Sequence, residues 1–320
     1  MVTLHHFTLP QWLAERGGWE NPDIVDHFTR FVTLVADALG DLVQWWVTIN
    51  EPVAYAFKGY LVGEWPPGKQ DFGAATRVLR HMMRAHAAAW QVLHARRSSA
   101  HVSIAHHGLA LRACEPRRLR DRISVRVRGH LCNRLFVEGL LSGHVRLPGL
   151  LWERLPQPAT LDYIGLNYYT RDFVHHAGAG LAGLLGRPCG RSHAADIGMT
   201  NSLGWEVYPE GLGELTRTFA RYGLPILITE NGTCTDSDTD RGSFIFMHLW
   251  QLVRALGQGV PVIGYLYWSL LDNFEWAHGY APRFGLVEVD YATQQRRIRR
   301  SAWMLSSLMR RAPEIERSVS

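Results

Sequence analysis

The sequence contains few cysteines, and none of them forms a familiar metal or redox motif. No CxxC pair is present, and no Cys/His cluster has the spacing of a zinc site. We therefore predict reduced thiols in a cytoplasmic protein that binds no metal and needs no cofactor. The four cysteines are Cys114, Cys132, Cys189 and Cys234.

Long apolar runs and targeting signals are missing as well. No window of about 18 uninterrupted apolar residues exists, which argues against a membrane-spanning helix. The first twenty residues carry His5, His6, Glu15 and Arg16 where a secretory signal would have an apolar run. No Gly-x-Gly-x-x-Gly follows the first candidate strand, and no phosphate-binding loop with lysine is present. An unrelated βα enzyme would need such a cofactor motif.

Lysine is almost absent, so the positive charge is carried by arginine. Only Lys58 and Lys69 are lysines, whereas the formal charge is +5 and the pI about 9.2. A basic cluster of this kind could bind phosphates, but acidic residues interrupt it and no nucleic-acid motif accompanies it. We expect a solvated arginine-rich surface and no nucleic-acid partner. The cluster consists of Arg117, Arg118, Arg120, Arg122, Arg126 and Arg128.

What the chain does contain is a regular alternation of strand and helix patterns. Short β-branched and aromatic runs read as strands, namely VTLHH, VQWWVTIN, HVSIAH, DYIGLNYY, PILITE and PVIGYLYWS. Stretches with helical spacing of apolar residues lie between and after them, at about 21–40, 73–97, 123–141, 210–222, 244–258 and 299–310. Six strand-helix units predict a parallel sheet covered by helices, as a barrel or a doubly wound sheet.

Polar and aromatic residues stand at the carboxyl ends of nearly all these strands. They are His6, Asn50, Glu51, His106, Asn167, Tyr169, Glu230, Asn231 and Trp268. In α/β barrels the active site is assembled from several strand ends at that face. Glu51 and Glu230 at one mouth would place two carboxyls in one pocket, which is the minimum needed to cleave a glycosidic bond. Either glutamate alone would more often be a salt-bridged strand-end acid than a catalytic one.

Six sequence blocks in this chain resemble glycoside hydrolase family 1, the β-glucosidase family. In order they are TLHHFTLP, WVTINEP, DYIGLNYYT, LGWEVYPEGL, PILITENG and GYLYWSLLDNFEWAHGYAPRFGLVEVDY. The resemblance covers almost the whole chain. It implies a TIM (β/α) barrel, a single catalytic domain over residues 1–320, and a retaining β-glycosidase acting on small β-glucosides by double displacement.

The resemblance assigns roles to the strand-end residues. Glu230 would be the nucleophile and Glu51 the general acid/base, with carboxyls roughly 5–5.5 Å apart in a retaining enzyme. Asn50 would bind the glycone 2-hydroxyl. Tyr169 would donate a hydrogen bond to Glu230, which keeps that carboxylate ionised.

Further residues would bind the sugar. Glu275 would take the outer glycone hydroxyls, where an acid disfavours 6-phosphoglycosides. Stacking faces would come from aromatic rings, since these present flat apolar surfaces to a pyranose. Taken alone, a strand-end histidine or one of twelve tryptophans is more often a structural residue. The remaining substrate-binding residues that the resemblance implies are His6, Asn167, Trp205, Trp268, Trp276 and Phe284.

The chain departs from the family pattern at its start. The family barrel has eight βα units, and this chain begins at what corresponds to the third. The first strand, with a glycone-binding Gln, and the second, with an Arg beside the nucleophile, have no counterpart. Without that cation Glu230 could be protonated or misplaced. Two sheet edges, at VTLHH and at VIGYLYWS, would be open. A second copy of the chain could cover them, His5 or nearby loops could fill the gap, or the gap could stay open as a solvent or ligand cleft.

Two functions from different classes therefore stay open. The first is an active retaining β-glycosidase, with reduced efficiency. The second is a catalytically impaired barrel that still binds sugars or another planar apolar ligand.

Overall fold

The computed structural model of the protein describes residues 1–147, 151–178, 180–189 and 197–319. Its centre is a six-stranded sheet in which every neighbouring pair is parallel. In spatial order, the strands are β1 (Val2–His5), β2 (Trp45–Asn50), β3 (His101–His107), β7 (Ile164–Asn167), β10 (Ile226–Asn231) and β11 (Val262–Tyr267). Spatial order follows chain order, as in the wall of a barrel.

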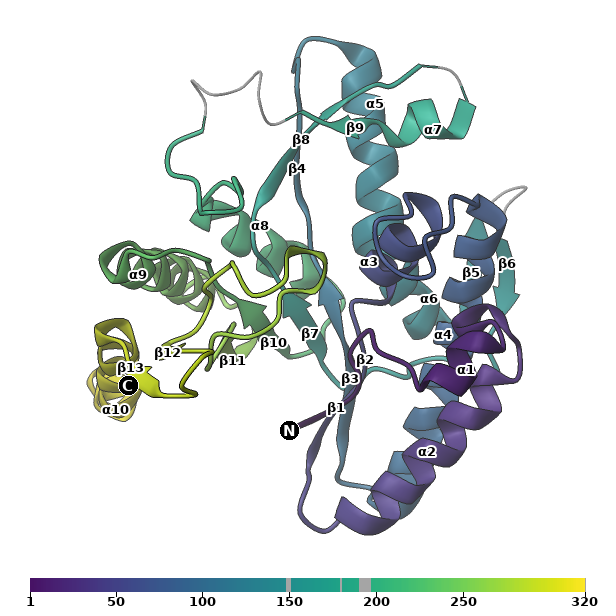
Figure 1. Cartoon of the computed structure of the whole chain (residues 1–320), viewed down its shortest axis with the longest axis horizontal. Helices are drawn as coiled ribbons and strands as arrows, with labels where there is room; N and C mark the ends of the chain where they lie inside the picture. The colour runs from purple at the N-terminus through teal and green to yellow at the C-terminus, as the bar shows by residue number, and fades with distance from the viewer. Residues whose placement is uncertain (148–150, 179, 190–196, 320) are drawn as a thin grey trace.

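Helices surround this sheet (Figure 1). They are α1 (Gln11–Glu15), α2 (Ile24–Leu39), α3 (Pro52–Ala56), α4 (Phe72–Arg96), α5 (Leu119–Gly129), α6 (Leu135–Ser142), α7 (Gly180–Leu185), α8 (Pro209–Ala220), α9 (Asp238–Leu256) and α10 (Arg300–Val319). Helix α2 packs on α4 near one edge of the sheet, and α8, α9 and α10 pack in succession near the other. Shorter helical turns are η1 (Gly18–Glu20), η2 (Phe57–Leu61), η3 (His130–Arg134) and η5 (Trp276–His278).

The interior strands are buried on both faces, whereas the edge strands are not. All residues of β7 and β10 are buried, and in β2 only Trp45 is partly exposed. These strands read as continuous apolar runs because helices cover one face and the barrel interior the other. Strand β11 alternates between half-buried and exposed residues, and Ile263 and Leu266 are 48% and 44% exposed. Strands β1 and β11 each have one neighbour within the described residues.

Most predicted elements are confirmed with shifted ends, and several smaller ones escaped the sequence patterns. The segment predicted as one helix over 123–141 consists of α5, a π-helical turn and α6. Three small sheets branch off the barrel strands. The first contains β4 (Ala110–Ala113), β8 (Arg171–His175) and β9 (Arg187–Pro188). The second pairs β5 (His144–Leu147) with β6 (Leu151–Arg154). The third pairs β12 (Val287–Val289) with β13 (Arg296–Ile298).

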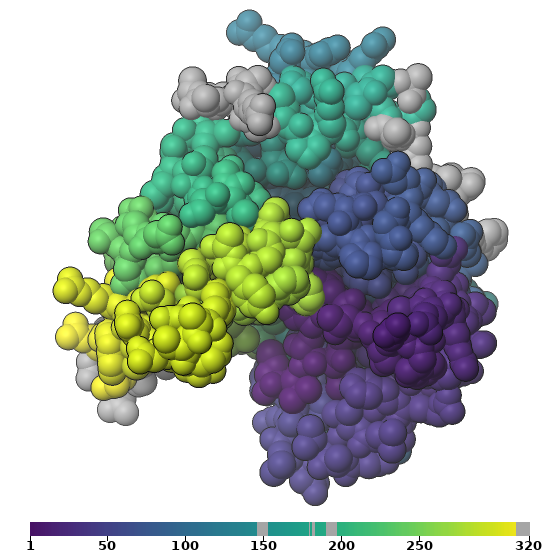
Figure 2. Space-filling view, viewed as in Figure 1, coloured from purple at the N-terminus to yellow at the C-terminus, as the bar shows by residue number. Residues whose placement is uncertain are grey.

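Figure 2 shows one face of the molecule, on which the N-terminal segment and the C-terminal helices form separate lobes with an indentation between them. The main apolar core lies between the sheet and helices α2, α4, α6 and α8 and includes Trp19, Trp46, Met82 and Phe136. Of the helices described, none is long and apolar enough to cross a lipid bilayer.

Two arginines of the cluster around α5 have partners within the protein. Arg128 is buried, stacks on the Phe57 ring at 5.7 Å and lies 3.5 Å from Asp172. Arg118 faces the carboxylates of Glu115 and Asp121 at 3.9 and 4.0 Å. Two of the six arginines are therefore engaged by partners within the protein, and the absence of a nucleic-acid partner stays a prediction.

Candidate active site

The carboxyl ends of the barrel strands surround a cavity of about 120 Å³. Both glutamates singled out in the sequence, Glu51 and Glu230, line it. So do seven of the nine residues expected to bind substrate, which are His6, Asn50, Tyr169, Trp205, Trp268, Glu275 and Trp276. The other two, Asn167 and Phe284, are 0% and 2% exposed and lie behind the cavity wall.

Glu51 follows β2 directly and is held in an unusual backbone conformation. Its φ is +44°, in the left-handed region that costs a residue with a Cβ about 1–3 kcal/mol. Its N–H donates to the Ala105 carbonyl at 2.7 Å, and Pro52 starts α3 immediately afterwards. The strand pairing also shifts register between Val47 and Asn50. Such irregularities re-aim side chains at the end of a strand, here into the cavity.

Glu230 lies near the end of β10, where the pairing with β7 also shifts register, between Ile228 and Glu230. The Tyr169 hydroxyl donates to its Oε2 at 2.6 Å, as the sequence predicts. Gly232 follows because a Cβ there would overlap the backbone carbonyl of Trp268. The glycine of this Asn-Gly pair therefore allows the chain after β10 to pack closely against the chain after β11.

Asn167 links the two carboxylates from behind. Its Nδ2 donates to Glu51 Oε1 at 2.9 Å and to Asn50 Oδ1 at 3.1 Å, and its Oδ1 accepts from the Thr229 hydroxyl at 2.6 Å. A buried amide with both ends satisfied is held in one orientation. Asn167 thus positions the acid-bearing strand end and does not contact the cavity itself.

The pKa of Glu230 is raised well above its ordinary value, first by burial and then by the negative charge of Glu51. Glu275 raises it further, whereas hydrogen bonds from Tyr169 and Asn167 lower it. Among the described residues, these main influences on Glu230 include no cation. The pKa of Glu230 is raised because ionising it next to the Glu51 carboxylate in one dry site is costly.

Glu275 lines the other side of the cavity, where its carboxylate is only partly hydrogen-bonded. Burial raises its pKa to about 7, partly offset by a hydrogen bond from Trp268. Among the described residues, its Oε2 has no hydrogen-bond partner although that atom is buried. A buried carboxylate oxygen without a partner is an acceptor awaiting a donor, such as a sugar hydroxyl.

His6 and two tryptophans form an aromatic wall. The His6 ring lies 5.6 Å from the Trp268 ring and 5.5 Å from the Trp276 ring, centroid to centroid. Burial lowers the pKa of His6, so the ring is neutral near pH 7. Asn50 Nδ2 donates to His6 Nε2 at 3.1 Å, which leaves the proton on Nδ1 as a donor.

Trp205 and Phe284 lie near Tyr169, the residue that donates to Glu230. The Trp205 ring lies 5.9 Å from Tyr169 and 6.2 Å from Phe284, and Tyr169 and Phe284 are 6.3 Å apart. Phe284 therefore supports the cavity wall from behind. Trp205 is the member of this trio that, with Tyr169, faces the cavity.

Sequence reasoning missed further cavity residues and chose one wrong neighbour. His106, noted as a polar strand end, is 1% exposed and packs on Phe219 of α8. His107 faces the cavity instead, with Nδ1 3.7 Å from Glu51 Oε2. Alternation of apolar and polar residues could have shown which histidine faces the cavity. The strand HVSIAHH has no such alternation, because its inner residues are buried on both faces. The other unexpected lining residues are Phe7, Ala54, Lys58, Glu64, Trp65 and His278.

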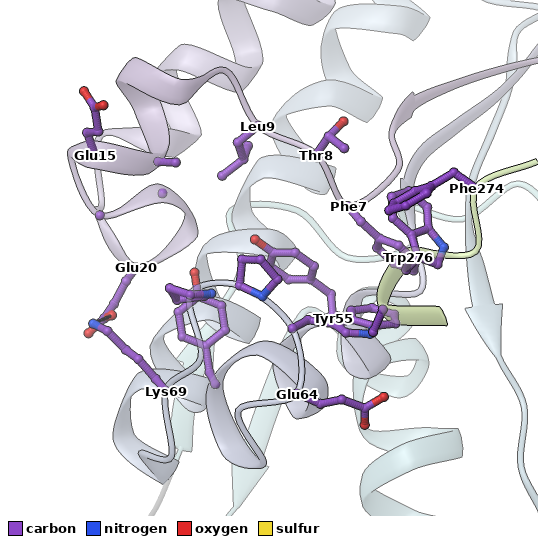
Figure 3. Close-up of a pocket in the computed structure, with 18 residues that line it drawn as sticks. Phe7, Thr8, Leu9, Glu15, Glu20, Tyr55, Glu64, Lys69, Phe274 and Trp276 are labelled. Carbon is purple, nitrogen blue, oxygen red and sulfur yellow. Dashed lines mark hydrogen bonds and ion pairs between the residues drawn. The ribbon is translucent and has the colours of Figure 1, made fainter. Parts of the chain in front are cut away.

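A larger cavity, of about 680 Å³, adjoins the first (Figure 3). The two share Phe7, Glu64, Trp65 and Trp276 in their walls. Figure 3 shows Phe7, Tyr55, Phe274 and Trp276 grouped on one side, with the Lys69 and Glu20 side chains near each other at the rim. That ion pair measures 2.5 Å. The lining is predominantly apolar and aromatic, which suits a ring-shaped apolar ligand.

Comparison with known proteins decides the family. The model of glycosyl hydrolase family 1 matches residues 1–147 and 153–313. The chain belongs to glycosyl hydrolase family 1. This family consists of retaining β-glycosidases, and both the family and the TIM-barrel fold expected from the sequence are confirmed.

Similar proteins include a chloroplastic galactolipid galactosyltransferase from Arabidopsis thaliana, 33% identical over 99% of this chain and 48% of that protein. A β-galactosidase from Sulfolobus acidocaldarius is 35% identical over 99% of this chain and 66% of its own length. A β-glucosidase from Thermotoga maritima, solved in complex with glucoimidazole, matches with a TM-score of 0.86 and 30% identity, covering 97% of this chain and 73% of that one. The chain thus spans about half to two thirds of the first two relatives, and its six strands form part of an eight-stranded family barrel.

Proposed function

We propose that the chain is a retaining β-glycosidase that hydrolyses small β-glucosides by double displacement. The observation that carries this proposal is that two buried glutamates from separate strands line one cavity, with Glu230 fixed by the Tyr169 hydroxyl. In this proposal Glu230 is the nucleophile and Glu51 the general acid/base.

The hydrogen-bond pattern supports this division of roles. Tyr169 donates to Glu230, which favours the ionised form needed for attack on the anomeric carbon. The proposed mechanism requires Glu230 to be ionised and Glu51 to carry the proton that it gives to the leaving oxygen. The raised pKa of Glu230 opposes this distribution in the free site. After the aglycone departs, the same Glu51 carboxylate takes a proton from water, and the hydroxide released cleaves the bond between the sugar and Glu230. Configuration at the anomeric carbon is retained because it inverts twice.

The other side of the cavity supports a neutral glycone. Glu275 offers a buried acceptor oxygen, and His6 offers a donor at Nδ1, both suited to hydroxyl groups. A phosphate on the sugar would meet the negative charge of Glu275. We infer that plain glycosides are preferred over 6-phosphoglycosides. Glucosides and galactosides are both tested, because relatives of both kinds are similar to this chain.

The decisive assay measures hydrolysis of aryl β-glucosides and β-galactosides by the wild type, Glu51→Ala, Glu230→Ala and the double variant. We expect turnover in the wild type that each single substitution reduces by roughly 10³-fold or more. Proton NMR of the first product should show the β-anomer. Wild-type turnover no higher than that of the double variant, in folded protein that still binds sugar, would rule out the proposal.

A second candidate function is ligand binding without catalysis. Two observations favour it: the raised pKa of Glu230 with no cation among its main influences in the described residues, and the apolar cavity beside the site. Here the barrel would hold sugars or another planar apolar ligand. Calorimetric titration of the Glu230→Ala variant with an aryl glucoside separates the two candidates. Binding with no wild-type turnover supports the second, and turnover supports the first.

A further inference from the structure

The three-stranded sheet outside the barrel brings together two thiols and an imidazole that lie far apart in the sequence. Cys114 follows β4, His175 ends β8, and Cys189 follows β9. One ligand atom of each lies within 4.8 Å of the other two. Figure 1 shows this sheet beside α5, away from the barrel centre. Its Cys/His group lines neither the active-site cavity nor the adjoining one.

The strand register directs the three side chains to one face of the sheet. Ala113 pairs with Val174 in the parallel β4–β8 pair, so Cys114 comes opposite His175. Pro188 pairs with Val174 in the antiparallel β8–β9 pair, so Cys189 comes opposite Phe173. Phe173 and His175 share a face because side chains alternate along a strand. Cys114 and Cys189 therefore flank His175 on that face.

Backbone hydrogen bonds hold both cysteines against the central strand. The Cys114 N–H donates to the Val174 carbonyl at 3.1 Å, and the Cys189 N–H donates to the Phe173 carbonyl at 2.7 Å. The Cys114 thiol lies 4.0 Å from the Cys189 carbonyl oxygen. Around a tetrahedral Zn²⁺ ion, neighbouring S and N ligand atoms lie roughly 3.5–3.8 Å apart. A contraction of about 1 Å or less would bring these side chains into ligand positions.

A buried carboxylate orients the imidazole. Asp121 is fully buried and accepts hydrogen bonds from the N–H groups of His176 at 2.9 Å and Glu115 at 3.3 Å. Its Oδ2 lies 3.3 Å from His175 Nδ1. A proton on Nδ1 directed at Asp121 makes Nε2 the ring nitrogen that would act as the metal ligand, the arrangement in which carboxylates support zinc-binding histidines.

We propose that Cys114, His175 and Cys189 bind a zinc ion that ties together the ends of β4, β8 and β9. Two thiolates and an imidazole are soft and borderline ligands that select Zn²⁺ over Mg²⁺ or Ca²⁺. The site is outside the catalytic cavity, so it stabilises this sheet and takes no part in glycoside cleavage. A disulfide between the two cysteines is the competing use of the same thiols.

The test begins with the wild-type protein, stripped with a chelator under reducing conditions and titrated with Co²⁺. We expect a single equivalent to bind with a thiolate charge-transfer band in the near ultraviolet and tetrahedral bands in the visible. Zn²⁺ should displace Co²⁺ and protect Cys114 and Cys189, but not Cys132, from alkylation measured by peptide mass spectrometry. This arm needs no variant and is independent of glycosidase activity.

Variants then assign the ligands. Cys114→Ser and Cys189→Ser should each abolish the charge-transfer band or cut it to about half, and Asp121→Asn should weaken binding about ten- to a hundredfold. Cys132→Ser is the matched control and should bind Co²⁺ like the wild type, with circular dichroism confirming that each variant is folded. Absence of the band in reduced wild-type protein, a band unchanged in both cysteine variants, or a Cys114–Cys189 disulfide in protein that binds no Co²⁺ after reduction would overturn the proposal.

Discussion

The two sides of the active-site cavity differ in how fully strand pairing and hydrogen bonds fix their carboxylates. Glu51 and Glu230 extend from β2 and β10, each paired with a strand on both sides. The hydrogen bonds of Asn167 and Tyr169 fix these carboxylates. Glu275, by contrast, lies beyond the edge strand β11 and keeps a buried oxygen without a partner among the described residues. The side with Glu51 and Glu230, where we propose catalysis, is held by hydrogen bonds, whereas Glu275 on the proposed sugar-binding side keeps an unsatisfied oxygen.

This difference follows from the position of the strands in the sheet. Interior strands are buried on both faces, so packing and register restrict their side chains. Edge strands β1 and β11 have one neighbour each in the described chain, and β11 exposes Ile263 and Leu266. Chemistry at the cavity should therefore be more robust than glycone affinity. The following predictions test that contrast.

The largest loss of activity should come from replacing Glu51, the proposed general acid. Glu51→Gln should lower kcat/KM for an alkyl β-glucoside by about 10²–10⁴-fold, since an alkoxide needs a proton to depart. For a dinitrophenyl β-glucoside, whose phenolate leaves unaided, the loss in kcat/KM should be far smaller. Glu138→Gln, which alters a surface carboxylate paired with Arg221, is the control. Equal losses for both substrates would contradict the role of Glu51.

Core substitutions should distinguish the two classes of strand. Ile228→Ala in β10, at a position 0% exposed, should lower the free energy of unfolding by about 2–5 kcal/mol. Ile263→Ala in β11, at a position 48% exposed, should cost less than about 1 kcal/mol. Urea unfolding followed by circular dichroism measures both. Similar losses at the two sites would mean that β11 is as well buried as β10 in solution.

Glu275 should limit stability at high pH. Its pKa in the fold is about 7 against an ordinary 4.5, so the folded state binds this proton more tightly than the unfolded state. Wild-type stability should fall as the pH rises from about 4.5 to 7, because the buried group must ionise. Glu275→Gln should match the wild type near pH 4 and exceed it by on the order of 2 kcal/mol at pH 8. A pH-independent difference would refute this explanation.

Removal of the Tyr169 hydroxyl should have the smallest effect. That hydroxyl lowers the pKa of Glu230, so Tyr169→Phe should raise it. The acidic limb of the kcat/KM profile should then move to higher pH, with about a tenfold loss at the optimum. The neighbouring substitution Tyr168→Phe removes a hydroxyl that donates to the Tyr208 carbonyl, away from the cavity. An unshifted acidic limb in Tyr169→Phe would show that this bond does not control ionisation.

The barrel and the catalytic pair were predictable from sequence because both depend on local patterns. Continuous apolar runs such as PILITE are typical of doubly buried strands, and the carboxylates at the ends of two of these runs, Glu51 and Glu230, are conspicuous. The hydroxyl contact of Tyr169 was predicted from the family resemblance and agrees with the 2.6 Å distance to Glu230. The roles of these residues stay predictions until they are assayed, as do the cytoplasmic location and the homo-oligomer.

Features that depend on contacts between distant segments could not be predicted. His107 instead of His106 faces the cavity because the sheet register, and not the sequence, sets which side of β3 points inward. The Cys114, His175 and Cys189 cluster is invisible to spacing rules, since its members lie on or next to three strands of a small sheet. The unsatisfied oxygen of Glu275 is likewise a property of packing.

The most direct test of the account is covalent trapping of the glycosyl-enzyme. Wild-type protein is incubated with a 2-deoxy-2-fluoro-β-glucoside bearing a good leaving group, and its intact mass and peptides are measured. The account predicts an added mass of one fluoroglucosyl unit on the peptide containing Glu230, and no addition in Glu230→Gln. The contradicting result is a label on another residue, or no label in protein that hydrolyses the parent glucoside.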